Sequence, residues 1–303
     1  MSNSENSVNS NNTLRFKKFI KDPLIVPYNA NNKLIKDVDL KEMMNNYDIK
    51  LDVIDIELYR QALTHKSYIK KEFYNKNSSE LEKAKLELGD VLELREESNE
   101  RLEFLGDTVI KSVIAEYLFE RYPNEDEGFM TRLKTKIENR ESLARFARII
   151  GLDVFVIISA QNEDSNLGRT NDKILEDAFE SFIAALYLDN NYDTCKLFIR
   201  NLLENLIDWS DLIFNDTNYK DQIQRYYHSI KWDHPSFKLL KEEQIPNNKK
   251  LFTIGVMDNN NHIIATATDT SKKKAEQRSS KIALYKFKQL NDYQMNDEDY
   301  QFL

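Results

Sequence analysis

The spacing of apolar residues changes near residue 211, and this change divides the chain into two modules. Before that point, apolar side chains recur every three or four residues, which is typical of amphipathic helices. Strand-like alternation is nearly absent there, so the first module is predicted to be all-α. The helices predicted from this spacing cover 52–69, 99–122, 127–138, 140–150, 171–188 and 192–208, with a loop over 161–170.

Beyond residue 211 a two-residue alternation takes over. Residues 236–241, 250–257 and 263–268 alternate as short antiparallel strands do, with polar turns between them. A helix is predicted before them, over 219–230, and another after them, with Ser271 as its N-cap. The second module is therefore predicted to be a small α+β domain of order α-β-β-β-α.

Composition completes the predicted domain organisation. The predicted parts are a disordered N-terminal extension over 1–45, the helical module over 46–210, a linker over 211–217, the α+β module over 218–290 and an acidic tail over 291–303. Within the helical module, residues 70–97 are highly charged. We expect this segment to be a solvated, partly helical elaboration, and an RNA clamp is the alternative.

Charge is distributed unequally between the modules. The net charge of the chain is −8, which by itself argues against a nucleic-acid partner. Residues 218–290, however, hold 14 Lys and Arg against 7 Asp and Glu, whereas residues 1–217 carry a net charge of −11. An acidic first module joined to a basic second module suggests a division of labour between them.

Two predicted helices carry carboxylates although they are apolar on most sides. The first contains N-E-R-L-E-F-L-G-D, from Asn99 to Asp107, and the second contains K-I-L-E-D-A-F-E, from Lys173 to Glu180. At about 100° per residue, the acidic residues of the first segment fall within an arc of about 60°. Helices of this kind are usually buried, and a buried carboxylate must be neutralised, paired or bound to a metal.

The four carboxylates Glu103, Asp107, Asp177 and Glu180 are expected to have no lysine or arginine on their stripes. A divalent cation is therefore the partner that we predict, and oxygen ligands suit Mg²⁺, with Mn²⁺ as a substitute. The alternative is that they are ordinary solvated acids. The presence of two such segments in one chain favours the cation.

Other chemistries find little support. The chain has neither a G-x-x-x-x-G-K-[ST] nor a G-x-G-x-x-G motif, so no nucleotide-driven activity is indicated. His65 and the three other histidines show no metal-ligand spacing, and Cys195, the single cysteine, lies on an apolar-periodic stretch that predicts a packed thiol. With no transmembrane run and no signal-peptide core, we expect a cytoplasmic protein without a membrane partner.

The order E-R-L-E-F-L-G-D, then Glu127–Gly128, then D-A-F-E, resembles ribonuclease III, and the upstream Q-A-L-T-H-K-S-Y looks like that family's opening helix. The resemblance covers roughly residues 50–290, and 70–97 looks like an insertion relative to compact bacterial members. It implies Glu103, Asp107, Asp177 and Glu180 as metal ligands, with Asp107 and Glu180 catalytic, and Glu100, Glu127 and Lys173 in supporting roles. It also implies a homodimer with Phe104 packed into the partner, although core packing alone would explain Phe104 equally well.

The second module resembles a double-stranded-RNA-binding domain. Three lysines crowd the start of its last helix, where ammonium groups and free N–H groups suit phosphates. The residues expected to contact RNA are Gln224, Lys249, Lys250, Lys272, Lys273 and Lys274. The module departs from the family pattern at I-P-N-N, residues 245–248, and at Ala265, Ala267 and Arg225, so we expect an altered or weaker grip, partly compensated by Lys249 and Lys250.

Together these features predict an endoribonuclease that cleaves double-stranded RNA by metal-dependent hydrolysis, leaving 5′-phosphate and 3′-hydroxyl ends. A double-stranded-RNA binder without cleavage is the main rival, and the presence of all four predicted ligands weighs against it. A carboxylate-metal phosphohydrolase acting on nucleotides is a third possibility, but it gives no reason for the basic second module.

Overall fold

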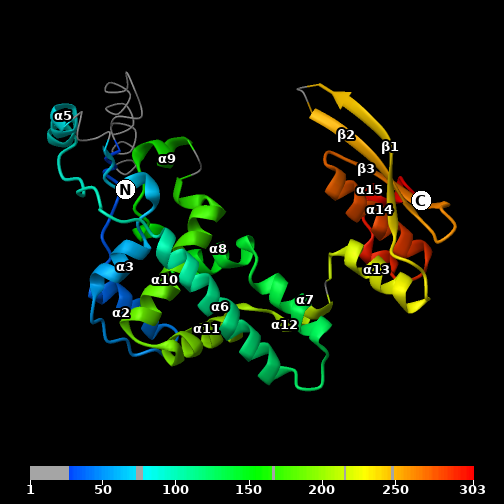
Figure 1. Ribbon diagram of the computed structural model, residues 1–303, viewed down its shortest axis with the longest axis horizontal. Helices are drawn as coiled ribbons and strands as arrows, with labels where there is room; N and C mark the ends of the chain where they lie inside the picture. The colour runs from blue at the N-terminus through cyan, green and yellow to red at the C-terminus, as the bar shows by residue number, and fades with distance from the viewer. Residues whose placement is uncertain (1–26, 73–77, 166–167, 215, 247–248) are drawn as a thin grey trace, which may run out of the picture. The chain divides into compact units, whose positions relative to one another are not determined.

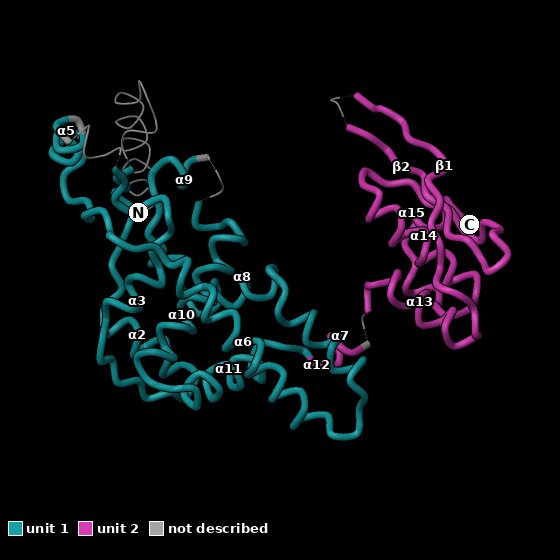
Figure 2. The backbone as a smooth tube through the Cα atoms, in the orientation of Figure 1, with its two compact units in different colours: residues 1–208 teal, residues 209–303 magenta. Residues whose placement is uncertain are grey.

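The computed structural model describes residues 27–303 except 73–77, 166–167, 215 and 247–248, and it separates into two compact units. Unit 1 comprises residues 1–208 and unit 2 comprises residues 209–303 (Figure 2). The boundary lies within three residues of the point where the apolar spacing changes. Each unit has a hydrophobic core of its own, so each is considered separately below.

Unit 1 is built from helices (Figure 1). Its elements are α2 (Asp37–Asn45), α3 (Ile56–Ala62), η1 (Lys66–Tyr68), α5 (Ser78–Leu88), α6 (Glu100–Arg121), α7 (Glu127–Ile137), α8 (Arg140–Ile149), η2 (Leu152–Phe155), α9 (Ala160–Ser165), η3 (Gly168–Thr170), α10 (Asp172–Asp189) and α11 (Tyr192–Leu206). The five long helices from α6 to α11 confirm the predicted ones to within two residues.

Helix α10 forms the centre of this unit. Thirteen of its eighteen residues are buried, and Figure 1 shows it surrounded by α3, α6, α8 and α11, with which it packs. Gly106 of α6 explains how closely two of these helices approach. A Cβ at that position would lie 1.7 Å from the backbone oxygen of Glu180, so only glycine permits this crossing. The crossing brings the acidic segments of α6 and α10 together.

Two predictions for the first hundred residues were wrong in part. The predicted helix over 52–69 is a short helix, α3, followed by the 3₁₀ turn η1. The predicted disordered extension ends earlier than residue 45, because residues 27–45 include α2 and contribute buried side chains such as Ile35 and Met44. Residues 1–26 lie outside the described part.

Two charged segments of unit 1 are more ordered than their composition suggested. The segment 70–97 contains α5, and Leu81 and Leu94 join a small core with Tyr28, Tyr68 and Ile157. The predicted loop over 161–170 contains most of α9 and the turn η3. A few apolar contacts hold the first segment, whereas polar contacts hold the second: Arg169 pairs with Glu163 at 3.0 Å and donates to Asn32 Oδ1 at 2.9 Å.

Unit 2 has the predicted α-β-β-β-α order (Figure 1). It begins with α12 (Trp209–Phe214), so part of the predicted linker is helical, and continues with α13 (Tyr219–Ser229), β1 (Ser236–Ile245), β2 (Lys249–Met257), β3 (Ile263–Asp269) and α14 (Lys272–Lys286). The strands form one antiparallel sheet in the order β1-β2-β3. Helix α14 packs on β2 and β3, and α13 packs on α14.

Residues 291–303, the predicted acidic tail, fold onto unit 2. They form the turn η4 (Asp292–Gln294) and the helix α15 (Asp297–Tyr300). Met295 is buried in the core of the unit and Phe302 packs against it. The carboxylate of Asp299 lies 2.5 Å from Lys281 Nζ and 3.1 Å from Arg278 Nε, which explains how an acidic segment can be held there.

Among the described residues, no helix combines the length and the apolar character needed to span a bilayer.

Candidate metal centre and RNA-binding surface

The candidate metal centre lies where α6 crosses α10. The close approach at Gly106 places Glu103 and Asp107 of α6 on either side of the crossing, opposite Glu180. Ser181 adds a second link, because its hydroxyl donates to the backbone oxygens of Asn99, at 3.2 Å, and of Asp177, at 2.6 Å. These contacts fix the start of α6 against the middle of α10.

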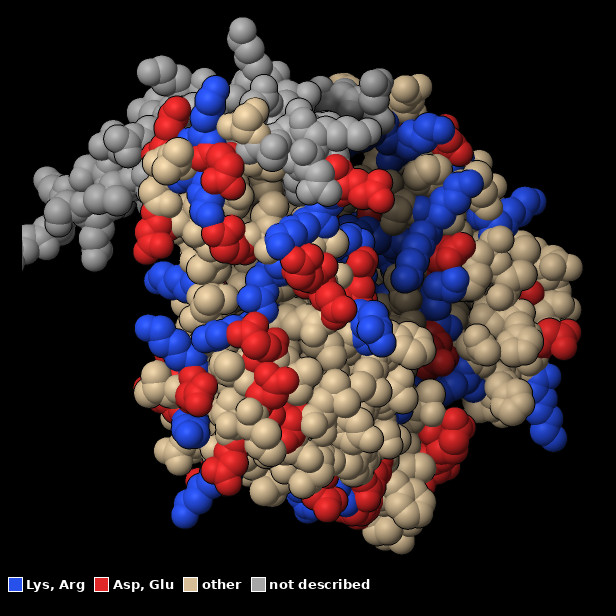
Figure 3. Space-filling model, turned by 60° about the vertical axis from the view of Figure 1, so that its left-hand side comes forward, with Lys and Arg blue, Asp and Glu red and all other residues tan. Residues whose placement is uncertain are grey.

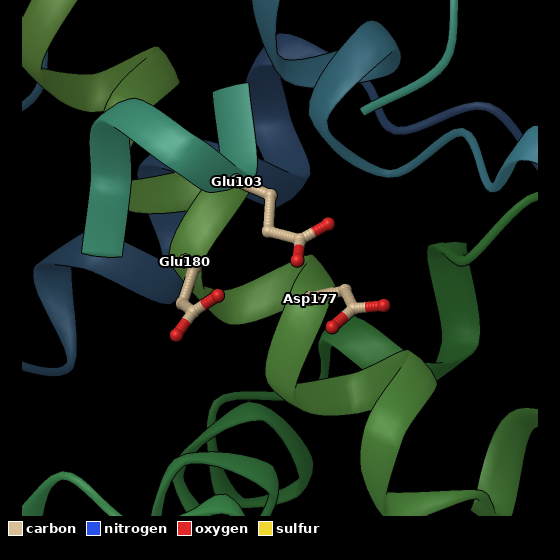
Figure 4. Close-up of side chains that lie close together, drawn as sticks. All are labelled: Glu103, Asp177 and Glu180. Carbon is tan, nitrogen blue, oxygen red and sulfur yellow. The ribbon is translucent and has the colours of Figure 1, made fainter. Parts of the chain in front are cut away.

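Three of the four predicted ligands meet at this crossing. Glu103, Asp177 and Glu180 each offer a carboxylate oxygen, and these oxygens lie within 4.8 Å of one another. Figure 4 shows the three side chains converging from the two helices on a common space. Asp177 and Glu180 are buried, and Glu103 is half-buried. The site therefore concentrates negative charge where little water can solvate it.

This arrangement changes the acidity of its members. Burial, and then the negative charge of Asp107, raise the pKa of Glu180 to about 8. Burial, followed by the charge of Asp177, also raises the pKa of Glu103. Carboxylates that crowd one another in this way stay ionised only if a positive charge offsets the repulsion. An oxygen-only set of this kind fits a hard divalent cation.

Asp107 is close to this group but not part of it. Its Oδ2 forms an ion pair with Lys111 Nζ, at a distance of 2.8 Å. Lys173 Nζ likewise lies 2.9 Å and 3.1 Å from the two carboxylate oxygens of Asp177. The expectation that no lysine shares the acidic stripes was therefore wrong. Each lysine stands four residues from its aspartate, and helical side chains meet at that spacing, so the sequence did contain the signal for Lys111.

The other two supporting acids lie outside the three-carboxylate group. Glu100 pairs with Lys66 at 2.9 Å, and hydrogen bonding to this lysine lowers the pKa of the carboxyl. Glu127 stands in the first turn of α7 and accepts a hydrogen bond from Thr131 Oγ1 at 2.8 Å. The supporting roles expected for Glu100 and Glu127 thus remain predictions.

Phe104 is 80% exposed although it lies between two of the acidic residues of α6. This exposure excludes packing in the core of unit 1, which was the alternative explanation for an aromatic residue here. Leu102 and Val109, on the other side of the helix, are buried. An apolar side chain of this size on the surface is consistent with a partner surface.

The histidine and cysteine predicted to be structural are held in the fold. His65 caps η1 by accepting from the backbone N–H of Ser67, and burial lowers the pKa of its ring to about 4. Burial raises the pKa of the Cys195 thiol to about 12, and the side chain is fully buried. Neither side chain is placed as a base or nucleophile for the candidate metal centre.

The basic residues of unit 2 lie where the sequence placed them. Ser271 caps α14 by accepting from Lys274 N–H, and Lys272, Lys273 and Lys274 are exposed in the first turn. The Lys272 ammonium lies 5.4 Å from the centre of the Phe252 ring, which orients it beside the sheet. Gln224 is exposed on α13. The start of α14 therefore presents free N–H groups and ammonium groups together.

The loop between β1 and β2 is less clearly basic. Lys249 is exposed, but Lys250 forms an ion pair with Glu242 at 2.6 Å. Residues 247–248 of the I-P-N-N stretch lie outside the described part. Arg225, where an acid was expected, pairs with Asp216 and Asp221. The compensating role expected for Lys249 and Lys250 is therefore an open prediction.

The two other departures from the expected pattern lie inside the unit. Ala265 and Ala267 are buried in β3, where small side chains let α14 lie close to the sheet.

Figure 3 shows that acidic and basic side chains are interspersed on one face of the molecule. The net charge of −8 therefore does not produce a uniformly acidic surface on that face.

Comparison with known proteins matches both units. A family model described as Ribonuclease-III-like matches residues 55–206, and one described as Double-stranded RNA binding motif matches residues 219–286. The chain is 34% identical over 236 residues to ribonuclease 3 of Staphylococcus aureus, covering 78% of this chain and 88% of that protein.

A viral relative and a solved structure are also similar. The chain is 40% identical over 263 residues to a probable ribonuclease 3 of Acanthamoeba polyphaga mimivirus; the match covers 86% of this chain but 47% of the relative, so the chain spans about half of its length. The nuclease domain of ribonuclease III from Campylobacter jejuni is 30% identical, with a TM-score of 0.44, over 57% of this chain and all of that domain.

Proposed function

Because the chain belongs to the ribonuclease III family of endoribonucleases, we propose that it cleaves double-stranded RNA by metal-dependent hydrolysis, leaving 5′-phosphate and 3′-hydroxyl ends. The observation that carries this proposal is the convergence of Glu103, Asp177 and Glu180 within 4.8 Å at the crossing of α6 and α10. Structural carboxylates are normally surrounded by donors, whereas these three face one another and only Asp177 has a cationic side chain, Lys173, on its oxygens among the contacts of the described residues.

The donor set supports Mg²⁺, with Mn²⁺ as a substitute. Glu103, Asp177 and Glu180 would hold the ion, and Asp107 would be the fourth ligand after leaving Lys111. Bound there, the ion would lower the pKa of a water molecule and stabilise negative charge on the scissile phosphate. We assign Asp107 and Glu180 as the catalytic pair because they face each other across the crossing, close enough for the charge of one to raise the pKa of the other.

The remaining polar residues would orient the reactants. Lys173 holds both oxygens of Asp177 and so fixes the direction of that carboxylate. Glu100 and Glu127 each head a helix, α6 and α7 respectively, and we propose that they order the RNA or further ligands at the edge of the site. No histidine or thiol is needed, which agrees with the structural roles of His65 and Cys195.

Unit 2 would supply most of the grip on the duplex. Domains of this kind recognise the shape and backbone of A-form RNA through phosphate and 2′-hydroxyl contacts. We propose Gln224 on α13, Lys249 and Lys250 in the hairpin, and Lys272, Lys273 and Lys274 on α14 as the contacts. Since each ammonium that neutralises a phosphate releases counterions, affinity should fall steeply with salt.

A homodimer through unit 1 completes the proposal. One chain carries one set of carboxylates, so cutting both strands of a duplex requires two chains. The 80% exposure of Phe104 beside the site supports a contact there. Phe104→Ala should weaken the dimer in sedimentation at micromolar concentration. A wild-type chain that stays monomeric yet cuts both strands would contradict this part.

Incubation with a long perfect RNA duplex tests the proposed activity. Mg²⁺ or Mn²⁺ should support cleavage, EDTA should abolish it, and single-stranded RNA of the same sequence should be cut far more slowly. End-labelling should reveal 5′-phosphates. If the duplex is bound at low salt but never cut with either ion, the chain is a double-stranded-RNA binder, and full activity in EDTA would rule out a metal centre.

A further inference from the structure

Asp107 differs from the other predicted ligands in its surroundings. It lies close enough to Glu180 for its charge to raise the pKa of that carboxyl, yet among the described residues its oxygens are not within the 4.8 Å group. Instead, Asp107 Oδ2 lies 2.8 Å from Lys111 Nζ, one turn further along α6. The aspartate is thus beside the metal centre but directed to a lysine.

The lysine at the other aspartate behaves differently. Lys173 contacts both oxygens of Asp177, and Asp177 nevertheless stays within the three-carboxylate group. Asp177 is also buried, so its position is fixed by packing. Asp107 and Lys111 have half-exposed side chains, at 35% and 49%. Of the two ion pairs, the one at Asp107 is therefore free to exchange.

We infer that Lys111 is a built-in competitor for Asp107, which holds the fourth carboxylate away from the other three and so sets the concentration of divalent cation needed to fill the site. An exposed ion pair between residues one helical turn apart contributes little. It can therefore yield to an ion of charge +2 that three further carboxylates already attract. Lys111 acts here through Asp107, as a positioning residue.

This inference rests on the proposed function, because it assumes that the carboxylates bind a cation. Its test is direct Mn²⁺ binding to the whole 303-residue chain, followed by the paramagnetic resonance of free Mn²⁺. Lys111→Met should tighten Mn²⁺ binding about two- to fivefold, since a pair of this strength no longer opposes the ion. Lys111→Arg keeps the charge and the reach, and should bind Mn²⁺ as the wild type does.

A double-mutant cycle separates the ion pair from a general effect of charge. In the Asp107→Asn background, Lys111→Met should no longer change Mn²⁺ affinity, because the carboxylate for which Lys111 and the ion compete has been removed. The inference is overturned if Lys111→Met binds Mn²⁺ with unchanged or weaker affinity, or if the same gain persists in Asp107→Asn.

A third variant distinguishes failure of this inference from failure of the proposed site. Glu180→Gln should weaken Mn²⁺ binding at least tenfold, because it removes a buried ligand. If Glu180→Gln and Asp107→Asn both bind Mn²⁺ as the wild type does, the site itself is wrong and the role of Lys111 falls with it. If they lose affinity while Lys111→Met gains none, only the role of Lys111 is wrong.

Discussion

Helix α10 buries acidic side chains at its C-terminal end and at its middle, in opposite surroundings. At its C-terminal end Asp189 is 5% exposed and accepts hydrogen bonds from the backbone N–H groups of Ile54 and Asp55 and from Tyr59 Oη. At its middle Glu180 is 8% exposed and faces carboxylates. Burial is therefore the same at the two positions, and the partners differ.

Asp299 of unit 2 resembles Asp189, because it too is a buried carboxylate with hydrogen-bond donors on its oxygens. Its carboxylate is 2% exposed and lies between Lys281 and Arg278. A buried carboxylate with donors or cations on its oxygens stabilises the fold, because its desolvation is offset. One that faces other carboxylates raises their pKa values and stores repulsion until a cation arrives. The comparison separates structural from functional acids, and the predictions below test it.

The largest effect is expected for cleavage by Glu180→Gln. The amide keeps the size of the side chain but removes the charge that would hold the ion, so single-turnover cleavage should fall on the order of 10³-fold, or about 4 kcal/mol of barrier. Duplex binding should persist, since it depends mainly on unit 2. Glu116→Gln, which removes a carboxylate from α6 that pairs with Lys196, is the control and should cleave normally. Near-normal cleavage by Glu180→Gln would remove this residue from the site.

Asp299→Asn should have the next largest effect, on the stability of unit 2. It leaves the nearly buried Lys281 ammonium without a carboxylate, which costs about 3 kcal/mol. Both tryptophans of the chain, Trp209 and Trp232, lie in unit 2, so tryptophan fluorescence during urea unfolding reports this unit. Glu298→Gln removes an exposed partner of Arg278 and should change the midpoint little. Equal midpoints for the two variants would show that Asp299 is not structural.

Much of this fold followed from sequence spacing alone. The long helices from α6 to α11 were predictable because each buries a regular apolar stripe, and the strands because apolar and polar residues alternate in them, although β1 is mostly exposed and extends four residues beyond the predicted 236–241. Segments that only a few specific contacts hold in place were not predictable in this way. Residues 27–45 and 291–303 are the examples. In the second, Met295, Asp299 and Phe302 fix a segment that composition describes only as an acidic tail, since composition does not reveal a specific partner such as Lys281.

The candidate site shows the same limit. The sequence identified which carboxylates share a helix face, and three of them meet as predicted. It did not show that Asp107 would lie outside the group formed by the other three carboxylates, because that depends on distances across the crossing of α6 and α10. Gly106 sets that crossing, and its role became apparent only from the position of the Glu180 backbone.

Asp189→Asn should affect unit 1 and leave unit 2 alone. One oxygen is replaced by an amide N–H₂ group that would face the backbone N–H groups of Ile54 and Asp55, or Tyr59 Oη. Losing a charged acceptor of several buried donors costs about 2 kcal/mol. The loss of helix content, followed by circular dichroism, should begin at a lower urea concentration, while the midpoint of the tryptophan fluorescence transition stays unchanged. A folded Asp189→Asn enzyme should cleave at the wild-type rate, unlike Glu180→Gln, and a lost rate would assign Asp189 to the chemistry.

The smallest effect is the dependence of stability on pH in EDTA. Because the folded pKa of Glu180 is about 8 and the ordinary value is about 4.5, the folded chain retains a proton between these values that the unfolded chain has released. The free energy of unfolding should therefore fall as pH rises through this window, on the order of 1–2 kcal/mol between pH 6 and pH 8. Glu180→Gln carries no such proton, so its decline should be shallower, whereas the exposed control Glu141→Gln should follow the wild type. Excess Mg²⁺ should also flatten the wild-type curve, because the ion replaces the proton as the partner of the carboxylates. Urea titrations at pH 6, 7 and 8 measure all four cases, and parallel declines for wild type and Glu180→Gln would show that this carboxyl does not carry the repulsion of the site.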